Sequence, residues 1–187
     1  IDIGGGTTEI AVIALSGIVT DQSIRVAGDE FTNDIIDYMK RKHNLLIGER
    51  TAEQIKINEG SAIPDLTEAP PKYAVNGRDM LTGIPKQVYT THSEVAEALD
   101  KSITKIEEAV LKALEDTPPE LASDIYKTGI YLTGGGALLR GLAKRISGKT
   151  KLAVHVAEDP LRAVVRGTGM ALKNSHRYSF LIDRRSI

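Results

Sequence analysis

The feature that most constrains the fold of this chain is a run of glycines close to its start. The stretch reads Asp2-Ile3-Gly4-Gly5-Gly6-Thr7-Thr8-Glu9, and an apolar segment typical of a strand, residues 9–15, follows directly. Glycine lacks a Cβ, so a phosphate could approach the backbone N–H groups here, and Thr7 and Thr8 add hydroxyl donors. The pattern predicts a strand–turn–strand phosphate loop, with a plain glycine-rich hairpin as the alternative.

Two better-known glycine motifs do not fit this turn. The dinucleotide-binding fingerprint needs a helix after its glycines, and a Walker A loop needs lysine and then serine or threonine, whereas Thr7-Thr8-Glu9 and a strand follow here. Asp2 needs an explanation, because a carboxylate beside phosphates is repelled unless a cation lies between them. Mg²⁺ is held by one or two carboxylates together with substrate phosphates. We therefore predict that Asp2 holds a hydrated Mg²⁺ ion or orients the attacking water.

A second glycine run, Gly134-Gly135-Gly136, follows a predicted strand at residues 130–133 and precedes Ala137, Leu138 and a predicted helix. Backbone amides at a helix start attract anions, and a bare backbone lets flat groups approach closely. A nucleotide base or ribose could lie on this turn. A tight connection that needs glycine only for its backbone angles explains the run equally well.

A second predicted helix, residues 51–61, carries Glu53 and Lys56, which are three positions apart and share a face. The simplest interpretation is a surface ion pair of little energetic value. The alternative is a pair that reaches a ribose hydroxyl and an adenine edge, which requires this part of the chain to overhang the glycine turns.

Composition excludes several kinds of protein. The 187 residues carry a net charge of −1, so the basic surface of a nucleic-acid binder is not expected. Without cysteine there is no disulfide framework or cysteine-bound metal, which fits a reducing cytosol. The four histidines are scattered without metal-ligand spacing. No apolar run approaches the roughly 20 residues that span a bilayer. Because Ile1 reads as the end of a strand, we expect a piece of a longer protein.

Strand-like and helix-like segments alternate along the chain, which predicts an α/β fold with a partly parallel sheet. Residues 27–91 read as an insertion between two parts of one sheet domain. Within it, Asn76-Gly77 predicts a turn. Asp29 and Ser93 are predicted to cap helices at residues 30–43 and 93–115. The remaining expected elements are two short strands within residues 18–26, strands at 72–75, 86–91 and 152–156, and a last helix from Pro160 to about Lys173.

Several long stretches resemble the MreB family of bacterial rod-shape-determining proteins, within the superfamily of actin, DnaK-type chaperones and sugar kinases. They are the first glycine stretch, residues 47–56, 118–125, 132–142 and 157–161. The resemblance implies an actin-like ATPase lobe of ribonuclease H-like fold with an inserted smaller α+β subdomain. Residues 1–26 and 92–157 would form the larger subdomain and residues 27–91 the smaller one. Residues 158–187 would form a helix returning to the missing first lobe, and a tail.

The resemblance also implies a site for ATP and Mg²⁺. Gly4, Gly5, Gly6, Thr7 and Thr8 would hold the β- and γ-phosphates, with Asp2 near Mg²⁺ and the lytic water. Glu53, Gln54, Ile55 and Lys56 would lie on the ribose and adenine side, and Gly134, Gly135, Gly136, Ala137 and Leu138 would cradle the adenosine.

A filament-forming protein that guides cell-wall synthesis and cell shape is the function that this resemblance implies. Its partners would be further copies of itself, the first lobe of the same chain, and membrane-associated cell-wall synthesis proteins. It would work in the cytoplasm at the inner face of the membrane, with membrane contact made outside this stretch and no nucleic-acid partner. The longer protein would be a slow ATPase, and this half alone would be inactive. A metabolite kinase or a DnaK-type chaperone ATPase of the same superfamily is the alternative.

Overall fold

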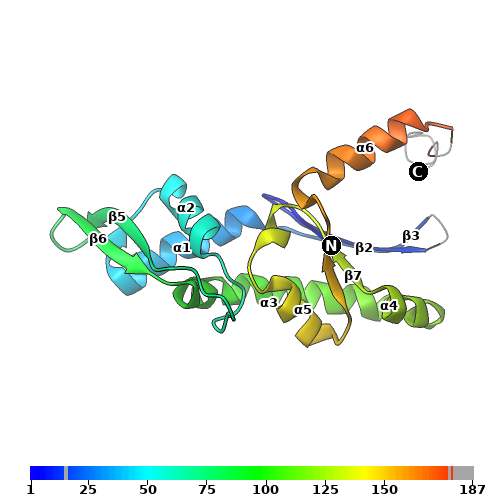
Figure 1. Ribbon diagram of the computed structural model, residues 1–187, viewed down its shortest axis with the longest axis horizontal. Helices are drawn as coiled ribbons and strands as arrows, with labels where there is room; N and C mark the ends of the chain where they lie inside the picture. The colour runs from blue at the N-terminus through cyan, green and yellow to red at the C-terminus, as the bar shows by residue number, and fades with distance from the viewer. Residues whose placement is uncertain (15–16, 177, 179–187) are drawn as a thin grey trace.

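The computed structural model describes residues 1–14, 17–176 and 178, and the molecule it shows is elongated (Figure 1). Leu15, the last residue of one predicted strand, and most of the predicted tail lie outside the described residues. One end of the molecule holds α1 (Gly28–His43), α2 (Glu49–Glu59) and three strands, β4 (Leu45–Leu46), β5 (Tyr73–Asp79) and β6 (Pro85–Thr90). The other end holds the remaining strands, β1 (Asp2–Ile3), β2 (Thr8–Ala14), β3 (Gly17–Ile24), β7 (Ile130–Leu132) and β8 (Val154–Val156).

Five strands at this second end line up in the order β3-β2-β1-β7-β8. The strands β1, β2 and β3 pair antiparallel, and β7 pairs parallel with β8. Thr133, just beyond β7, joins the two groups: the Ile3 N–H donates to its carbonyl at 2.9 Å, and its N–H donates to the Ile1 carbonyl at 2.8 Å. The predicted partly parallel α/β sheet is therefore confirmed, with β1 at its centre.

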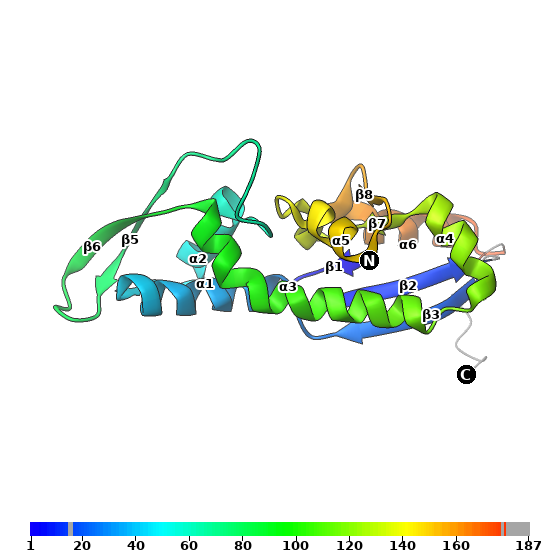
Figure 2. The same ribbon diagram turned by 90° about the horizontal axis from the view of Figure 1, so that it is seen from below.

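The long helix α3 (His92–Glu115) connects the two ends of the molecule. It lies along β2 and β3 in Figure 2 and packs against these strands at one end and against α1 and α2 at the other. Its apolar stripe is fully buried at Leu99, Ile103 and Ile106, as the helical spacing of these residues predicts. Burial of this stripe joins both ends of the molecule in one hydrophobic core.

Three shorter helices and three 3₁₀ turns complete this end. The helices are α4 (Ala122–Thr128), α5 (Leu142–Thr150) and α6 (Ala163–Lys173), and the turns are η1 (Pro119–Leu121), η2 (Gly135–Leu138) and η3 (Pro160–Arg162). The second glycine run therefore enters a 3₁₀ turn, and the α-helix begins only at Leu142. Pro160 likewise opens a 3₁₀ turn that precedes α6.

The triplet Gly148-Lys149-Thr150 matches the end of a Walker A motif in sequence. It lies at the end of α5, however, and Ala143 stands where that motif needs its first glycine, so it is not a Walker A loop.

The predicted turn at Asn76-Gly77 is wrong, because both residues lie inside β5, opposite Gln87 and Lys86. The glycine is needed there for another reason: a Cβ on Gly77 would lie 2.5 Å from the Leu46 carbonyl oxygen of the unpredicted strand β4. The actual turn follows β5. The Asp79 carboxylate accepts hydrogen bonds from the N–H groups of Leu81 and Thr82, both at 2.9 Å.

Three further local predictions need correction. Residues 18–26 do not form two strands, because a register shift opposite Val12/Ile13 lets one bent strand, β3, continue along β2. Asp29 does not cap α1, whose N-cap is Ala27 without a side-chain hydrogen bond. Ser93 does not cap α3 either. Thr91 does, in a capping box in which its hydroxyl accepts from the Glu94 N–H and the Glu94 carboxylate accepts from the Thr91 N–H.

Replacing the actual cap should weaken α3, and replacing the predicted one should not. We expect Thr91→Ala to lower the free energy of unfolding by about 1 kcal/mol, because an N-terminal N–H of α3 loses its acceptor. Ser93→Ala is the matched control and should change it little. Urea unfolding followed by circular dichroism measures both, and equal losses in the two variants would contradict this assignment of the cap.

Candidate functional site

The first glycine turn, residues 4–7, is fastened to the start of α1. The turn closes through the Gly4 N–H, which donates to the Thr7 carbonyl at 3.0 Å. The N–H groups of Gly28 and Asp29 donate to the carbonyls of Gly4 at 3.1 Å and Gly5 at 2.8 Å. The carbonyls of Gly4, Gly5 and Thr7 thus accept hydrogen bonds inside the protein, while residues 5–7 are exposed to solvent.

Packing inside the protein does not explain why positions 5 and 6 are glycine. A Cβ on Gly5 would come no closer than 3.7 Å to a neighbouring atom, and one on Gly6 no closer than 3.9 Å; both neighbours are carboxylate oxygens of Asp29. Neither glycine has the positive φ that would itself require glycine. The bare backbone therefore leaves room for a group from outside the chain, which favours a phosphate loop over a plain hairpin.

The glycines of the second turn are different, because packing accounts for two of them. Gly134 has φ of +79°, and a Cβ there would collide with the Asp2 carboxylate and the Ile3 carbonyl. A Cβ on Gly136 would collide with the buried Ile3 side chain. Only Gly135 is exposed and open, with the Leu161 side chain 3.5 Å from the position of its Cβ.

Both turns nevertheless meet at one edge of the sheet. They follow β1 and β7, which run parallel and are joined through Thr133, and the carboxyl ends of parallel strands are where α/β sheets bind ligands. The Asp2 carboxylate lies against Gly134, so the side chain predicted to serve the first turn touches the second. The structure thus brings Asp2, the exposed residues 5–7 and the exposed Gly135 and Leu138 together.

Three predicted site residues have side chains that face the core instead. Thr8 is fully buried, and its hydroxyl donates to the Val26 carbonyl at 2.6 Å. Ile55 is fully buried and Ala137 is 4% exposed. The prediction of a hydroxyl donor to phosphate consequently rests on Thr7 alone, and Ile55 and Ala137 could face a ligand only through their backbone.

Glu53 and Lys56 form more than a surface ion pair. The Lys56 ammonium lies 2.7 Å from the Glu53 carboxylate and donates to the Gly28 carbonyl at 2.8 Å and to the Thr32 hydroxyl at 3.0 Å. Its side chain is only 16% exposed. Gly28 in turn holds Gly4, so the pair connects α2 through the first turn of α1 to the glycine turn. Burial acts to raise the pKa of Glu53, but hydrogen bonds from Lys56 and Thr32 keep it below its ordinary value.

Next to this network, a polar hollow opens between the first turns of α1 and α2. It is lined by Asp29, Thr32, Asn33, Glu49, Arg50 and Glu53. Of these six residues, the sequence predicted only Glu53 as a site residue. The signal for Asp29 was available, because it follows Gly28 directly, but it was interpreted as a helix cap. Among the described residues, no group of three or more acidic or histidine side chains is placed to hold a metal by itself.

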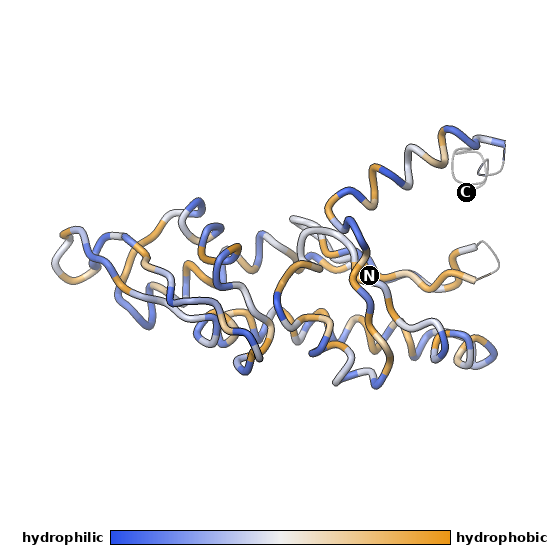
Figure 3. The backbone as a smooth tube through the Cα atoms, viewed as in Figure 1, coloured by the Kyte–Doolittle hydropathy of each residue, from blue (hydrophilic) through white to orange (hydrophobic). Residues whose placement is uncertain are grey.

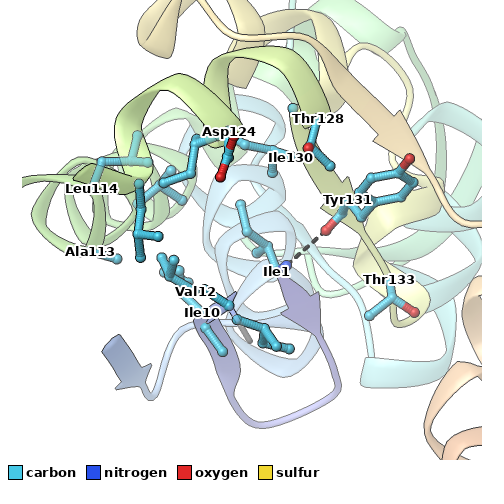
Figure 4. A pocket seen from close by; sticks show the side chains of 17 residues that line it. Ile1, Ile10, Val12, Ala113, Leu114, Asp124, Thr128, Ile130, Tyr131 and Thr133 are labelled. Carbon is cyan, nitrogen blue, oxygen red and sulfur yellow. Dashed lines mark hydrogen bonds between the residues drawn. The ribbon is translucent and has the colours of Figure 1, made fainter. Parts of the chain in front are cut away.

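A second hollow, which is mainly apolar, lies on the other side of Ile1, between β2 and β7 (Figure 4). Val12, Ala113, Leu114 and Ile130 are among the side chains that line it, and Asp124 supplies its carboxylate. It offers no cationic side chain, so it does not suit a phosphate.

Comparison with known proteins decides the family. The family model of the MreB/Mbl protein matches residues 1–179. The chain belongs to the MreB/Mbl family. It is 48% identical over 174 residues to the cell shape-determining protein Mbl of Bacillus subtilis and 49% identical over 173 residues to the cell shape-determining protein MreB of Escherichia coli. These alignments cover 93% and 92% of this chain but 52% and 49% of the relatives, so the chain spans about half their length.

Solved structures of actin-like proteins show the same fold. The crystal structure of MreB5 of Spiroplasma citri bound to AMPPNP superposes with a TM-score of 0.89 at 38% identity, over 94% of this chain and 52% of that one. The double helical filament of MamK superposes with a TM-score of 0.71 at 24% identity, over 90% of this chain and 53% of that one, which supports the fold alone. The predicted actin-like fold is confirmed.

Because their surroundings differ, Gly136 and Gly5 should respond differently to an added methyl group. Gly136→Ala should lower the free energy of unfolding by about 1–3 kcal/mol, because Ile3 is buried and has no room to move. Gly5→Ala should leave stability unchanged, because its Cβ would have only ordinary contacts. Thermal unfolding monitored by calorimetry measures both. Equal destabilisation by the two substitutions would mean that the first turn is also built for internal packing.

The hydrogen bonds and ion pair of Lys56 predict that its replacement lowers stability more than replacement of an exposed lysine does. Lys56→Met should cost about 1–3 kcal/mol of stability, because the Gly28 carbonyl, the Thr32 hydroxyl and Glu53 all lose a partner. The control is Lys105→Met, since Lys105 and Glu30 form an exposed pair 3.9 Å apart that contributes little.

The difference in stability between the wild type and Lys56→Met should decrease at acidic pH. The pKa of Glu53 is lowered in the folded state, so its contribution is complete above the ordinary pKa of 4.5 and is lost as the pH falls through the lower, folded-state value. The stability advantage of the wild type over Lys56→Met should therefore shrink below about pH 4.5. An advantage that is constant from pH 7 to pH 3 would show that the Glu53 carboxylate takes no part in it.

Proposed function

We propose that this chain is the second lobe of an actin-like, ATP-binding filament protein that helps to determine cell shape. The observation that carries the proposal is the meeting of two glycine turns at one sheet edge, with Asp2 against Gly134 and an open backbone at Gly5 and Gly6. Membership of the MreB/Mbl family supports it, as does the AMPPNP bound to the similar MreB5 structure. A metabolite kinase or a chaperone ATPase lobe is not favoured, because the family match covers nearly the whole chain.

Each turn has a distinct role in the proposed site. The exposed backbone of Gly5, Gly6 and Thr7 binds the β- and γ-phosphates, because N–H groups free of Cβ atoms can surround an anion. The open Gly135 and the exposed Leu138 accept the flat faces of the adenosine. Glu53, Gln54 and Lys56 border the ribose side, where the polar hollow opens.

The carboxylates at the first turn fit a magnesium ion that is bound mainly through the nucleotide. Asp2 and Asp29 are oxygen ligands of the kind that Mg²⁺ prefers, and Mg²⁺ needs only one or two of them when phosphates complete its shell. When bound, the ion neutralises phosphate charge. Asp2 would hold it through its hydration shell or orient the attacking water.

This lobe alone should bind nucleotide weakly and should not hydrolyse it. Phosphoryl transfer depends on groups that surround and position the reacting phosphate, and the phosphate turn here covers one side. The complete protein would be a slow ATPase whose first lobe closes the site. The exposed apolar side chains of α6 suit contact with that lobe: α6 stands apart from the sheet (Figure 1), and apolar and polar stretches alternate along it (Figure 3). The exposed apolar side chains of α6 are those of Val164, Val165, Met170 and Leu172.

Filament contacts and the place of action follow from the same proposal. The turn between β5 and β6 presents the exposed apolar side chains of Met80, Leu81 and Ile84 at one tip of the molecule, where a further copy of the protein could bind. No helix in the described part of the chain is long and apolar enough to cross a membrane. We propose that the complete protein acts in the cytoplasm at the inner face of the membrane with cell-wall synthesis proteins, through membrane contacts outside this chain.

The nucleotide site is tested by titration with a fluorescent ATP analogue, with and without Mg²⁺. We expect saturable binding that is lost in Gly135→Val, because the side chain would occupy the adenosine surface. Asp2→Asn should lose the dependence on Mg²⁺. Gly148→Val, at an exposed and open position in α5, is the matched control and should bind normally.

In the same samples, we expect no release of phosphate above the level without protein. Binding that is equal in the wild type and in Gly135→Val would contradict a site made by both turns. Hydrolysis by the chain alone would contradict the need for a second lobe.

A further inference from the structure

The segment that leaves α2 and the segment that leaves the second glycine turn are bound to each other. The Ala62 N–H donates to the Arg140 carbonyl at 2.8 Å. The Arg140 guanidinium in turn donates to the Asn58 carbonyl at 2.9 Å. We refer to residues 58–63 and 139–145 together as the junction.

Two glycines show how closely the halves of the junction pack. A Cβ on Gly60 would lie 2.9 Å from a side-chain carbon of Leu139. A Cβ on Gly141 would lie 2.5 Å from the side chain of Ile63, and Gly141 also has a φ of +75°. Each segment thus has a glycine where a side chain of the other segment packs, so neither can shift without breaking these contacts.

Arg145 holds the junction against α3. Its Nη1 donates to the Ala62 carbonyl at 3.1 Å, and its Nε donates to the Glu107 carboxylate at 2.9 Å. Its Nη1 also lies 2.8 Å from the Asp100 carboxylate, and its Nη2 donates to the Thr104 hydroxyl at 3.1 Å. The side chains of Arg145 and Glu107 are only 16% and 8% exposed. Because a guanidinium presents its donors in a fixed plane, Arg145 fixes α5, α3 and the segment after α2 relative to one another.

The junction joins two sides of the candidate site. On one side, α2 carries Glu53 and Lys56 and ends where the junction begins. On the other side, the second glycine turn presents the open Gly135 and the exposed Leu138 directly before the junction. A change in the junction should therefore change the gap between α2 and the second glycine turn.

We propose that Arg145 is a positioning residue that sets this gap, and through it the affinity of the site for the adenosine part of a nucleotide. Its nitrogens bind α3 and the Ala62 carbonyl, so it acts on a ligand only through the junction. The inference rests on the proposed function for the identity of the ligand, whereas the gap is a property of the chain without ligand. Phosphate binding by the first turn should not depend on Arg145, because that turn is bound to Gly28 and Asp29 instead.

A double substitution separates positioning from folding. Arg145→Met alone would leave the Glu107 carboxylate buried without its partner, which strongly destabilises a protein. Arg145→Met combined with Glu107→Met removes both charges together, and apolar replacement of a whole buried pair is often tolerated. The double variant still loses the hydrogen bond to the Ala62 carbonyl. The matched control is Ile106→Val, at a fully buried position of the same helix, which lowers stability and leaves the junction bonded.

The gap is measured first, without nucleotide. The chain contains no cysteine, so spin labels can be attached to Ile57→Cys on α2 and Leu138→Cys on the second turn, both at exposed positions. We expect electron paramagnetic resonance to give the same distance distribution in the wild type and in Ile106→Val. In the double variant the distribution should be broader or shifted, and an unchanged distribution would overturn the inference.

Ligand binding tests the consequence for the site. Two ligands are titrated with Mg²⁺ and followed by NMR: ATP, and tripolyphosphate, which carries the phosphates without the adenosine. We expect the double variant to bind ATP about tenfold more weakly than Ile106→Val does, because small displacements of positioning groups are costly. Its affinity for tripolyphosphate should equal that of the control. An equal loss for both ligands would show a general structural role and would overturn the inference.

The two measurements separate this inference from the proposed function. If the wild type bound no ATP, the proposed function would fail, and the label distances would still decide whether Arg145 sets the gap. If the wild type bound ATP and the double variant bound it equally well, this inference would fail and the proposed function would stand.

Discussion

The arrangement of the site depends on the hydrogen bonds between β1 and Thr133. They place β1 at the centre of the sheet and bring together two glycine turns that are separated by more than a hundred residues of sequence. Gly134 must be glycine because the Asp2 carboxylate and the Ile3 carbonyl lie where its Cβ would be. The close approach of β1 and β7 therefore brings the two glycine turns together. It also explains why position 134 of the second turn must be glycine.

A second set of bonds transmits this geometry to the smaller end of the molecule. The carbonyls of Gly4 and Gly5 hold the first turn of α1, and Lys56 holds the same turn of α1 to α2. The first glycine turn, α1 and α2 are thus connected by hydrogen bonds, and α3 packs against both ends of the molecule. The position of the glycine turn is therefore tied to the first turn of α1, and through Lys56 to α2.

Much of this could be predicted from the sequence. The apolar stripe of α3 and the strand–turn–strand around residues 4–7 follow from local periodicity and from glycine chemistry. The turn at Asn76-Gly77 could not, because a backbone contact with β4, distant in sequence, requires the glycine and overrides local turn propensity. For the same reason the sequence could not show that internal packing requires glycine at positions 134 and 136 but not at positions 5 and 6. Asp29 was misassigned because an acidic residue before a helix is typical of a cap, whereas here its carboxylate faces the glycine turn.

The central claim is that both glycine turns form one nucleotide site. Replacement of Mg²⁺ by paramagnetic Mn²⁺ with ATP, followed by two-dimensional NMR of the backbone amides, tests it most directly. The account predicts that ATP with Mn²⁺ broadens the signals of Gly5, Gly6 and Thr7 strongly and those of Gly134 and Gly135 in the same titration, while Leu81 at the far tip is unaffected. Broadening at the first turn with no change at the second would contradict a shared site and would leave Gly134-Gly135-Gly136 as a purely structural connection.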